Sequence, residues 1–325
     1  MEHNRFLAHA WKGDPDPLRQ VMAILLTWAI FILLGGSILM LPVAYLLVSN
    51  PAQAEAYLAD PMNFKLLGMD PILVFILIMC QFVVGLGGIW ATERLLLRKP
   101  FRWVVTGYRR FRKGRFLAGL GAWMGLMCLY ELAAYAMDPQ SFRLTPDIGR
   151  SLLFLPIALL LVPLQSAFEE VATRGQLMQG LIRLAPAKPY LALLLTSGIF
   201  AAMHLMNTEV QAYGAGLMLL HYFTFGAVLG AFALMDEGLE LSIGIHAGNN
   251  LFSLCLVSYP ESSLETPALL HQQAMSEGMD FLFMLLCVGV MYAVFFGRRP
   301  QAWRVVLENL RTGSAEPQDS PEKAG

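Results

Sequence analysis

The sequence predicts an all-α membrane protein, a polytopic bundle of about eight transmembrane helices. Of its 325 residues, 56% are hydrophobic and only 14% are charged. An average soluble domain carries about a quarter charged residues. The apolar residues also gather into stretches long enough to cross a hydrocarbon core about 30 Å thick. Composition and the length of the apolar stretches therefore both predict membrane-spanning helices.

Each apolar stretch is a candidate helix. In chain order the stretches are residues 21–48, 72–97, 116–136, 152–168, 191–206, 214–235, 241–257 and 279–296. The first is far longer than the apolar part of a signal peptide, about 7 to 15 residues, and no small-residue cleavage site follows it. We therefore expect it to stay in the protein as a helix.

The stretches also suggest a division of the chain. We expect an N-terminal segment (1–20), helices one to three with a basic connection (21–150), a core of helices four to seven (151–260), a last helix (261–300) and a tail (301–325). The tail from Gly313 has no large apolar residues, so we expect it to be disordered.

The loops predict the orientation of the bundle. Nine basic residues follow the second stretch, namely Arg94, Arg98, Lys99, Arg102, Arg109, Arg110, Arg112, Lys113 and Arg115, whereas the neighbouring loops lean acidic. Lys and Arg near helix ends are held on the cytoplasmic side. We therefore expect an integral protein of the plasma (inner) membrane with both termini cytoplasmic. The basic loop is a topology signal that can contact anionic lipid, and with a net charge of -1 we expect no nucleic-acid partner.

Three charged residues stand together inside an apolar stretch: Glu169, Glu170 and Arg174. A charge at the centre of a membrane helix costs about 2.5 to 3.5 kcal/mol on insertion scales, and such residues usually serve function. Residues four apart share a helix face, so Glu170 and Arg174 should pair. A structural ion pair would explain those two residues. It leaves Glu169, which points about 100° away, without a role.

His204 is a candidate partner for Glu169. The two residues lie 17 positions before and 18 positions after Pro186, in a stretch that breaks the helix. In an antiparallel hairpin about that turn they would face each other at the same depth. A structural histidine is the alternative.

His246 and Asn250 form a third polar group, again four residues apart on one helix face. Gly244 and Gly248 would let a neighbouring helix approach closely. Hydrogen bonding between helices is the structural alternative for His246 and Asn250. We interpret His221 and Glu131 as structural, because no residue pairs with either of them by spacing. The isolated cysteines Cys80, Cys128, Cys255 and Cys287 are also interpreted as structural, because none has the paired spacing of a metal or redox site.

These residues carry a resemblance. The run from Glu169 to Arg174 is similar to an E-E-x-x-x-R motif, residues 200–204 to F-x-x-x-H, and residues 246–250 to H-x-x-x-N. In this order, on successive helices, they resemble the CPBP family of intramembrane proteases, which includes CAAX prenyl endopeptidases and lysostaphin-resistance protein A-like proteins.

The resemblance implies an endopeptidase that opens from the membrane and the cytoplasmic side and cleaves a membrane-associated protein or peptide. Carried over to this chain, Glu169 would be the general base and His204 its companion in activating water. His246 and Asn250 would hold the oxyanion, and Glu170 and Arg174 would support them. We expect no cofactor, although Glu169, His204 and His246 could form a zinc site with an open position. The H-E-x-x-H helix of common zinc proteases is missing.

The depths at which the site residues would lie in the membrane raise one difficulty. His246 lies near the start of its stretch and therefore close to the membrane surface, whereas Glu169 would lie deeper. We expect Arg174 to mark the membrane surface, residues 175–188 to protrude as a hairpin with Arg183 and Lys188 solvated, and residues 207–209 to face a cavity.

Two other classes of protein stay open. A transporter usually shows internal repeats, and the sequence shows none. A catalytically silent scaffold or immunity protein of the same fold is the other class, and it would keep its phenotype in the variant Glu169→Gln, whereas a protease would lose it.

Overall fold

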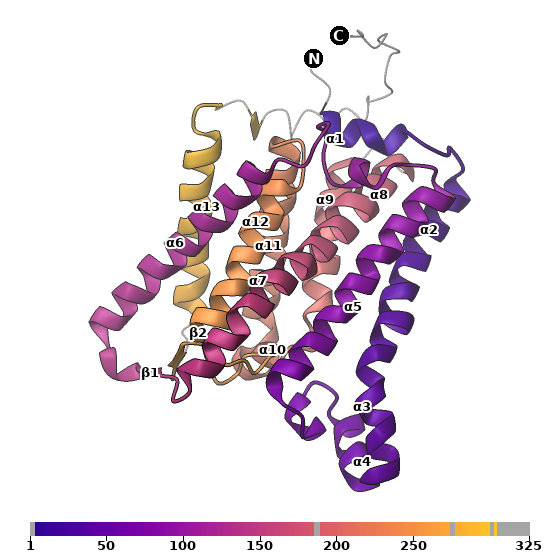
Figure 1. The fold of residues 1–325 in the computed structure, drawn as a ribbon. Helices are drawn as coiled ribbons and strands as arrows, with labels where there is room; N and C mark the ends of the chain where they lie inside the picture. The colour runs from indigo at the N-terminus through magenta and orange to yellow at the C-terminus, as the bar shows by residue number, and fades with distance from the viewer. Residues whose placement is uncertain (1–3, 185–188, 274–276, 300–301, 304–325) are drawn as a thin grey trace.

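The computed structural model describes residues 4–184, 189–273, 277–299 and 302–303, and within them the chain is a helical bundle (Figure 1). Its helices are α1 (Arg5–Ala8), α2 (Pro17–Ala29), α3 (Gly36–Ser49), α4 (Pro51–Ala59), α5 (Pro71–Ala91), α6 (Lys113–Met137), α7 (Ile148–Glu170), α8 (Met178–Leu184), α9 (Pro189–Met203), α10 (Thr208–Tyr213), α11 (Ala215–Met235), α12 (Glu240–Leu251) and α13 (Glu277–Phe296). The predicted all-α class is confirmed. The predicted disordered tail and Lys188 lie outside the described residues.

Every predicted apolar stretch contains a helix, but the helices differ in length. Six helical runs of the described chain are long and apolar enough to cross a membrane: Pro17–Ser49, Pro71–Leu96, Lys113–Met137, Ile148–Leu184, Ala215–Met235 and Gly278–Phe296. The other two stretches give α9 and α12, which are shorter. Residues 240–248 of α12 are all buried, so this helix lies among its neighbours and needs no long lipid-facing surface.

Aspartates explain why several long helices begin where they do. The side chain of Asp16 accepts a hydrogen bond from the amide of Leu18, and that of Asp70 accepts one from Ile72. A proline follows each of them, at the first helical position. An N-cap carboxylate satisfies an otherwise free amide, and proline has no amide there to lose. Polar caps therefore stand at the borders of the apolar stretches.

The bundle has two distinct ends in Figure 1. We call the end with α1 and α8 the terminal end, and the end with α4, α10 and β1 the far end. The far end also carries a small sheet of β1 (Phe142–Leu144), β3 (Leu270–Gln272) and β2 (Val257–Ser258), in that order, with β3 antiparallel to β1 and parallel to β2. The sequence did not predict this sheet, because two or three residues are too few to show a strand pattern.

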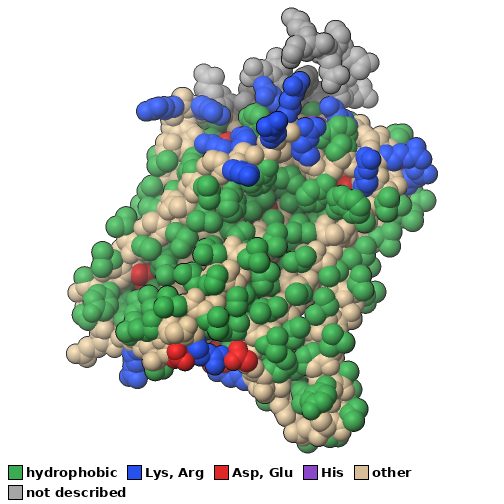
Figure 2. Space-filling view, in the orientation of Figure 1, with side chains coloured by type: hydrophobic (Ala, Val, Ile, Leu, Met, Phe, Trp, Pro, Cys, Tyr) green, Lys and Arg blue, Asp and Glu red, His purple; other side chains and the backbone are tan. Residues whose placement is uncertain are grey.

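Apolar side chains cover the flank of the bundle, and basic side chains gather at the terminal end (Figure 2). Many large apolar side chains are well exposed, for example Leu25, Leu33, Leu153, Leu160 and Leu286. Exposed apolar area of this extent fits hydrocarbon and not water. The chain is an integral membrane protein.

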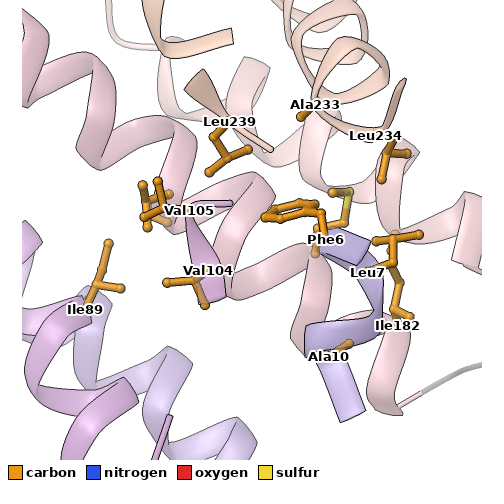
Figure 3. Packing of buried hydrophobic residues seen from close by; sticks show 14 of the residues in the cluster. Phe6, Leu7, Ala10, Ile89, Val104, Val105, Ile182, Ala233, Leu234 and Leu239 are labelled. Atoms are coloured by element: carbon orange, nitrogen blue, oxygen red, sulfur yellow. The ribbon is translucent and has the colours of Figure 1, made fainter. Parts of the chain in front are cut away.

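The N-terminal segment is built into the bundle. Phe6 and Leu7 are buried against Val104, Ile182 and Leu234, which come from three separate parts of the chain (Figure 3). Buried amides hold the segment as well, because the side chain of Gln179 donates to the carbonyls of Phe6 and Trp103. This packing shows that residues 4–11 are more than a solvated leader to the first helix.

The same packing corrects the expected hairpin. Residues 171–180 are all buried, Arg174 fully so, and Arg183 donates to the carbonyl of Ala10. Gly175 lies so close to the loop that an added Cβ would be 2.2 Å from the carbonyl oxygen of Val104. The prediction that Arg174 marks the surface and that residues 175–188 protrude is therefore wrong for the described part. The N-terminal segment and the α5–α6 loop cover this stretch.

We expect His9 to make the attachment of this segment pH-dependent. Its ring stacks on Trp103 at 5.2 Å, and its Nδ1 lies 3.2 Å from the carbonyl oxygen of Trp103. Burial, with Lys12 as a smaller cause, lowers the pKa of His9 from 6.5 to about 4. The unfolded segment therefore binds more protons, and the stability from neutral His9 is lost as pH falls from 6.5 towards 4.

We expect hydrogen exchange in residues 4–12, corrected for its intrinsic pH dependence, to accelerate as pH falls through this window. His9→Phe keeps the stacking and removes the titrating group, so its exchange should not change between the same pH values. Equal pH dependence of the parent and His9→Phe would contradict this role.

Candidate active site

The predicted ion pair of Glu170 and Arg174 is present at the junction of α7 with a π-helical turn, η7 (Val171–Leu177). Arg174 Nη1 lies 3.0 Å from Glu170 Oε1, and both side chains are fully buried. Arg174 also donates to Thr173 Oγ1 at 2.8 Å and to the carbonyl of Gly226 at 2.9 Å, and its guanidinium lies over the ring of Phe200. The pair thus ties α7 to α9 and α11. Single π-helical turns often occur at functional sites.

His246 of α12 lies between the two glutamates. Its Nδ1 is 3.0 Å from Glu170 Oε1, and its Nε2 is 3.4 Å from Glu169 Oε2. The ring is 3% exposed and meets Phe200 and Phe225 edge-on. The structure therefore joins the E-E-x-x-x-R and H-x-x-x-N motifs directly, although 76 residues separate Glu170 from His246.

The contacts of His246 fix where its protons can lie. Glu170 is paired with Arg174 and is an acceptor, so Nδ1 of His246 carries a proton. Nε2 and Glu169 Oε2 are 3.4 Å apart without a hydrogen bond, and a second proton on either the imidazole or the Glu169 carboxyl would make this contact favourable. Both placements leave the four side chains with no net charge, which a buried cluster requires. A proton can therefore pass between Glu169 and His246 without changing the charge of the cluster.

His204 follows α9 and contacts other groups. Its Nδ1 lies 2.7 Å from the carbonyl oxygen of Phe200, and its ring stacks on Tyr222 at 4.2 Å. A carbonyl only accepts, so Nδ1 carries the proton and the neutral ring keeps a free acceptor at Nε2. Among the described residues no ion pair or hydrogen bond joins His204 to Glu169. The structure places His246 against Glu169, and Glu169 and His204 line one cavity, so the predicted joint action of these two side chains stays a prediction.

Asn250 and Gln165 form a side-chain amide pair near Glu169. Asn250 Nδ2 donates to Gln165 Oε1 at 2.9 Å, and Gln165 lies one helical turn before Glu169 on α7. Asn249 holds the same end of α12, because its Oδ1 accepts from Trp123 Nε1 at 3.1 Å. Sequence reasoning missed Gln165. The signal was its position four residues before Glu169, which places both on one face.

Two glycines bring α12 against α6, as predicted. A Cβ added to Gly244 would lie 2.1 Å from the carbonyl oxygen of Phe116, and one added to Gly248 would lie 2.8 Å from that of Leu120. Any larger residue would push α12 away from α6. The glycines therefore set the depth at which α12 carries His246 and Asn250.

A cavity of about 580 Å³ adjoins this cluster. Glu169, His204, Asn250 and Gln165 all line it, whereas His246 is not part of its wall and lies behind Glu169. The expected cavity-facing residues Asn207 and Glu209 line it too, together with Glu131 and His221, which the sequence analysis treated as structural. One side of its apolar wall comes from α2, α5 and the segment between them, with Trp28, Phe31, Met62, Phe64, Ile78, Met79 and Phe82.

The alternative zinc site would need Glu169, His204 and His246 close together. In the described part of the chain no group of three or more His, Cys, Asp or Glu side chains is placed to hold a metal ion. Glu169, His204 and His246 are therefore not gathered as a ligand set. The four cysteines are free, and two of them, Cys255 and Cys287, are buried in apolar clusters.

Comparison with known proteins identifies the segment that carries the cluster. Residues 150–252 match the family described as type II CAAX prenyl endopeptidase Rce1-like. This segment is similar to that family. The match confirms the resemblance predicted from the three motifs, and it contains Glu169, Glu170, Arg174, His204, His246 and Asn250.

A similar protein aligns over more of the chain than this segment. The chain is 29% identical over 258 residues to a Bacillus subtilis (strain 168) protein described as uncharacterized protein YyaK. The alignment covers 78% of this chain and 82% of that protein. No solved structure matches the chain.

Proposed function

We propose that this protein is an intramembrane endopeptidase that hydrolyses a peptide bond of a membrane-associated protein or peptide. One observation carries the proposal: Glu169, His204 and Asn250 line a single cavity, and the buried His246 lies against Glu169. We further propose the inner membrane as its location, with cytoplasmic termini and membrane lipid as a standing partner.

Glu169 is the proposed general base. With the shared proton on His246, Glu169 is a carboxylate next to an imidazolium and can take a proton from water as the water attacks the carbonyl. His204 helps to hold this water, because its Nε2 is a free acceptor facing the same cavity. A positioned base of this kind contributes about 10² to 10⁴-fold in rate. The proton then passes to the leaving amine, which leaves the base as it started.

The oxyanion needs donors on the cavity wall. Asn250 has one N–H bound to Gln165 and a second available, and it lines the cavity. We propose Asn250 as the main donor. His246 lies behind Glu169 in this arrangement, so we assign it to positioning Glu169 and carrying the shared proton. This differs from the role that the resemblance implies for His246.

We expect Asn250→Ala to lower kcat by about 10² to 10³-fold, the usual loss of one oxyanion donor, with KM nearly unchanged. The interaction is made only in the transition state, so kcat and kcat/KM should fall together. Asn250→Asp is the matched control, because it keeps the shape and cannot donate. It should be as slow as Asn250→Ala.

The substrate for these kinetics comes from membrane proteomics of cells with the parent chain and with Glu169→Gln, in which protein fragments found only with the parent mark cleavage. A rise in KM at constant kcat would contradict the role of Asn250. Metal analysis of the purified protein tests the cofactor: a stoichiometric zinc whose loss tracks activity would replace the direct-water mechanism.

A further inference from the structure

The cavity is directed away from the terminal end. Its wall includes connecting segments at the far end, among them Met62, Phe64, Glu209, Tyr259 and Ser262. At the terminal end, by contrast, the described residues 4–16, 94–116 and 171–202 contribute nothing to the wall. The resemblance implied a site open to the side of the basic loop, and the geometry points to the opposite side.

Packing closes the terminal side. The catalytic helix beyond Glu170 is buried for ten residues, 171–180, beneath Phe6, Leu7, Val104 and Val105 (Figure 3). The carbonyl of Val104 is pressed against Gly175, so no space is left between the loop and the helix at that point. A substrate entering from this side would have to displace the whole N-terminal segment.

The basic residues of the connections indicate on which side of the membrane the terminal end lies. The α5–α6 connection at the terminal end carries nine basic residues over 94–115. Of the far-end connections, 50–70 has one, 138–150 has two, and neither 204–214 nor the described residues 257–273 have any Lys or Arg. Short loops rich in Lys and Arg stay on the cytoplasmic side. The far end is therefore extracytoplasmic.

The side chains on the wall of the cavity that can carry a charge near neutral pH are carboxylic acids and two histidines, His204 and His221. The wall contains four carboxylic side chains, Glu131, Glu169, Glu209 and Asp280, and none of its residues is Lys or Arg. Glu131 Oε2 is buried without a hydrogen-bond partner, and Glu209 is held by Ser263. A cleft lined by one sign of charge attracts the opposite sign and repels its own. A free C-terminal carboxylate beside the scissile bond would meet no cation here.

We propose that the substrate reaches Glu169 from the extracytoplasmic side, as a membrane-proximal polypeptide segment that is neutral or cationic around the cleaved bond. This proposal rests on the proposed endopeptidase function. It goes further by excluding an acidic or free-carboxylate C-terminus as the preferred segment. The apolar wall of α2 and α5 accepts the hydrophobic part of that segment, and the carboxylates at the far end accept its basic part.

The side of entry can be tested by labelling, independently of catalysis. In a background with the four cysteines replaced by alanine, Ser262→Cys places a thiol on the cavity wall and Arg109→Cys places one on the exposed basic loop. We expect a membrane-impermeant maleimide on intact cells to label Ser262→Cys, and to label Arg109→Cys only after permeabilisation. Size-exclusion chromatography verifies that each variant is folded. The reverse pattern would overturn the proposal.

The charge preference is tested by binding. Two fluorescent acyl-peptides, identical except for Lys or Glu at one position, are titrated against the purified parent in detergent. We expect the Glu peptide to bind at least about tenfold more weakly, since like charges brought together are strongly disfavoured. The variant Glu131→Gln should show a smaller difference in affinity between the Lys peptide and the Glu peptide. Equal binding of both peptides would overturn the substrate class, whereas absence of cleavage with these results intact would count only against the endopeptidase function.

Discussion

Glu169→Gln is expected to abolish cleavage while the protein folds and accumulates like the parent. The amide keeps the shape of the side chain and can still contact His246 Nε2, but it cannot take a proton from water. The loss should be at least about 10² to 10⁴-fold, the usual contribution of general base catalysis. Fragment yields in membranes and single-turnover rates on the purified protein measure it.

Glu261→Gln is a matched control for this experiment. Its carboxylate accepts from Tyr213 at the far end and does not line the cavity, so the same chemical change should leave turnover within about twofold, as for substitutions away from special features. A scaffold would keep its cellular phenotype in both variants. Normal cleavage by Glu169→Gln would rule out Glu169 as the base.

The fold was largely predictable, because a membrane imposes simple rules. Each long apolar stretch of the sequence became a helix, since backbone groups in hydrocarbon have to be satisfied within the helix. The rules failed where protein and not lipid surrounds the chain. Residues 171–180 are polar enough to suggest a solvated hairpin, yet Gln176 and Gln179 are buried and hydrogen-bonded to Glu93, Phe6 and Trp103. Such partners come from distant segments, which no local pattern reveals.

The sequence predicted which residues belong to the site better than it predicted which of them contact one another. Spacing of four residues identified the Glu170–Arg174 pair, because that contact is made within one helix. The partner of Glu169 depended on how two helices meet. The hairpin argument assumed regular helices up to His204, whereas η7 is π-helical and α9 ends at Met203. His204 hydrogen-bonds the carbonyl of Phe200 and lines the same cavity as Glu169, and α12 adds His246 as a contact of Glu169 that the hairpin argument did not consider.

Arg174→Ala is expected to reduce the amount of folded protein as well as activity. Removing one partner of a buried ion pair typically costs about 3 to 5 kcal/mol, because the remaining charge is left uncompensated. Here Glu170 is fully buried, and without Arg174 it would share the site with Glu169 and only His246 to balance both. The carbonyl of Gly226 loses its donor as well. Detergent-extracted yield and thermal melting measure the loss.

A double variant separates folding from catalysis at this pair. Glu170→Leu with Arg174→Met replaces both charges by apolar side chains, which is often neutral or stabilising for a buried pair. We expect it to recover much of the yield and melting temperature lost in Arg174→Ala. Activity should stay low, because His246 Nδ1 no longer has Glu170 as its acceptor and can no longer hold its protonated form against Glu169. If Arg174→Ala instead accumulated and melted like the parent and had lost only turnover, Arg174 would act on the reaction directly and the pair would not be what holds α7 to its neighbours.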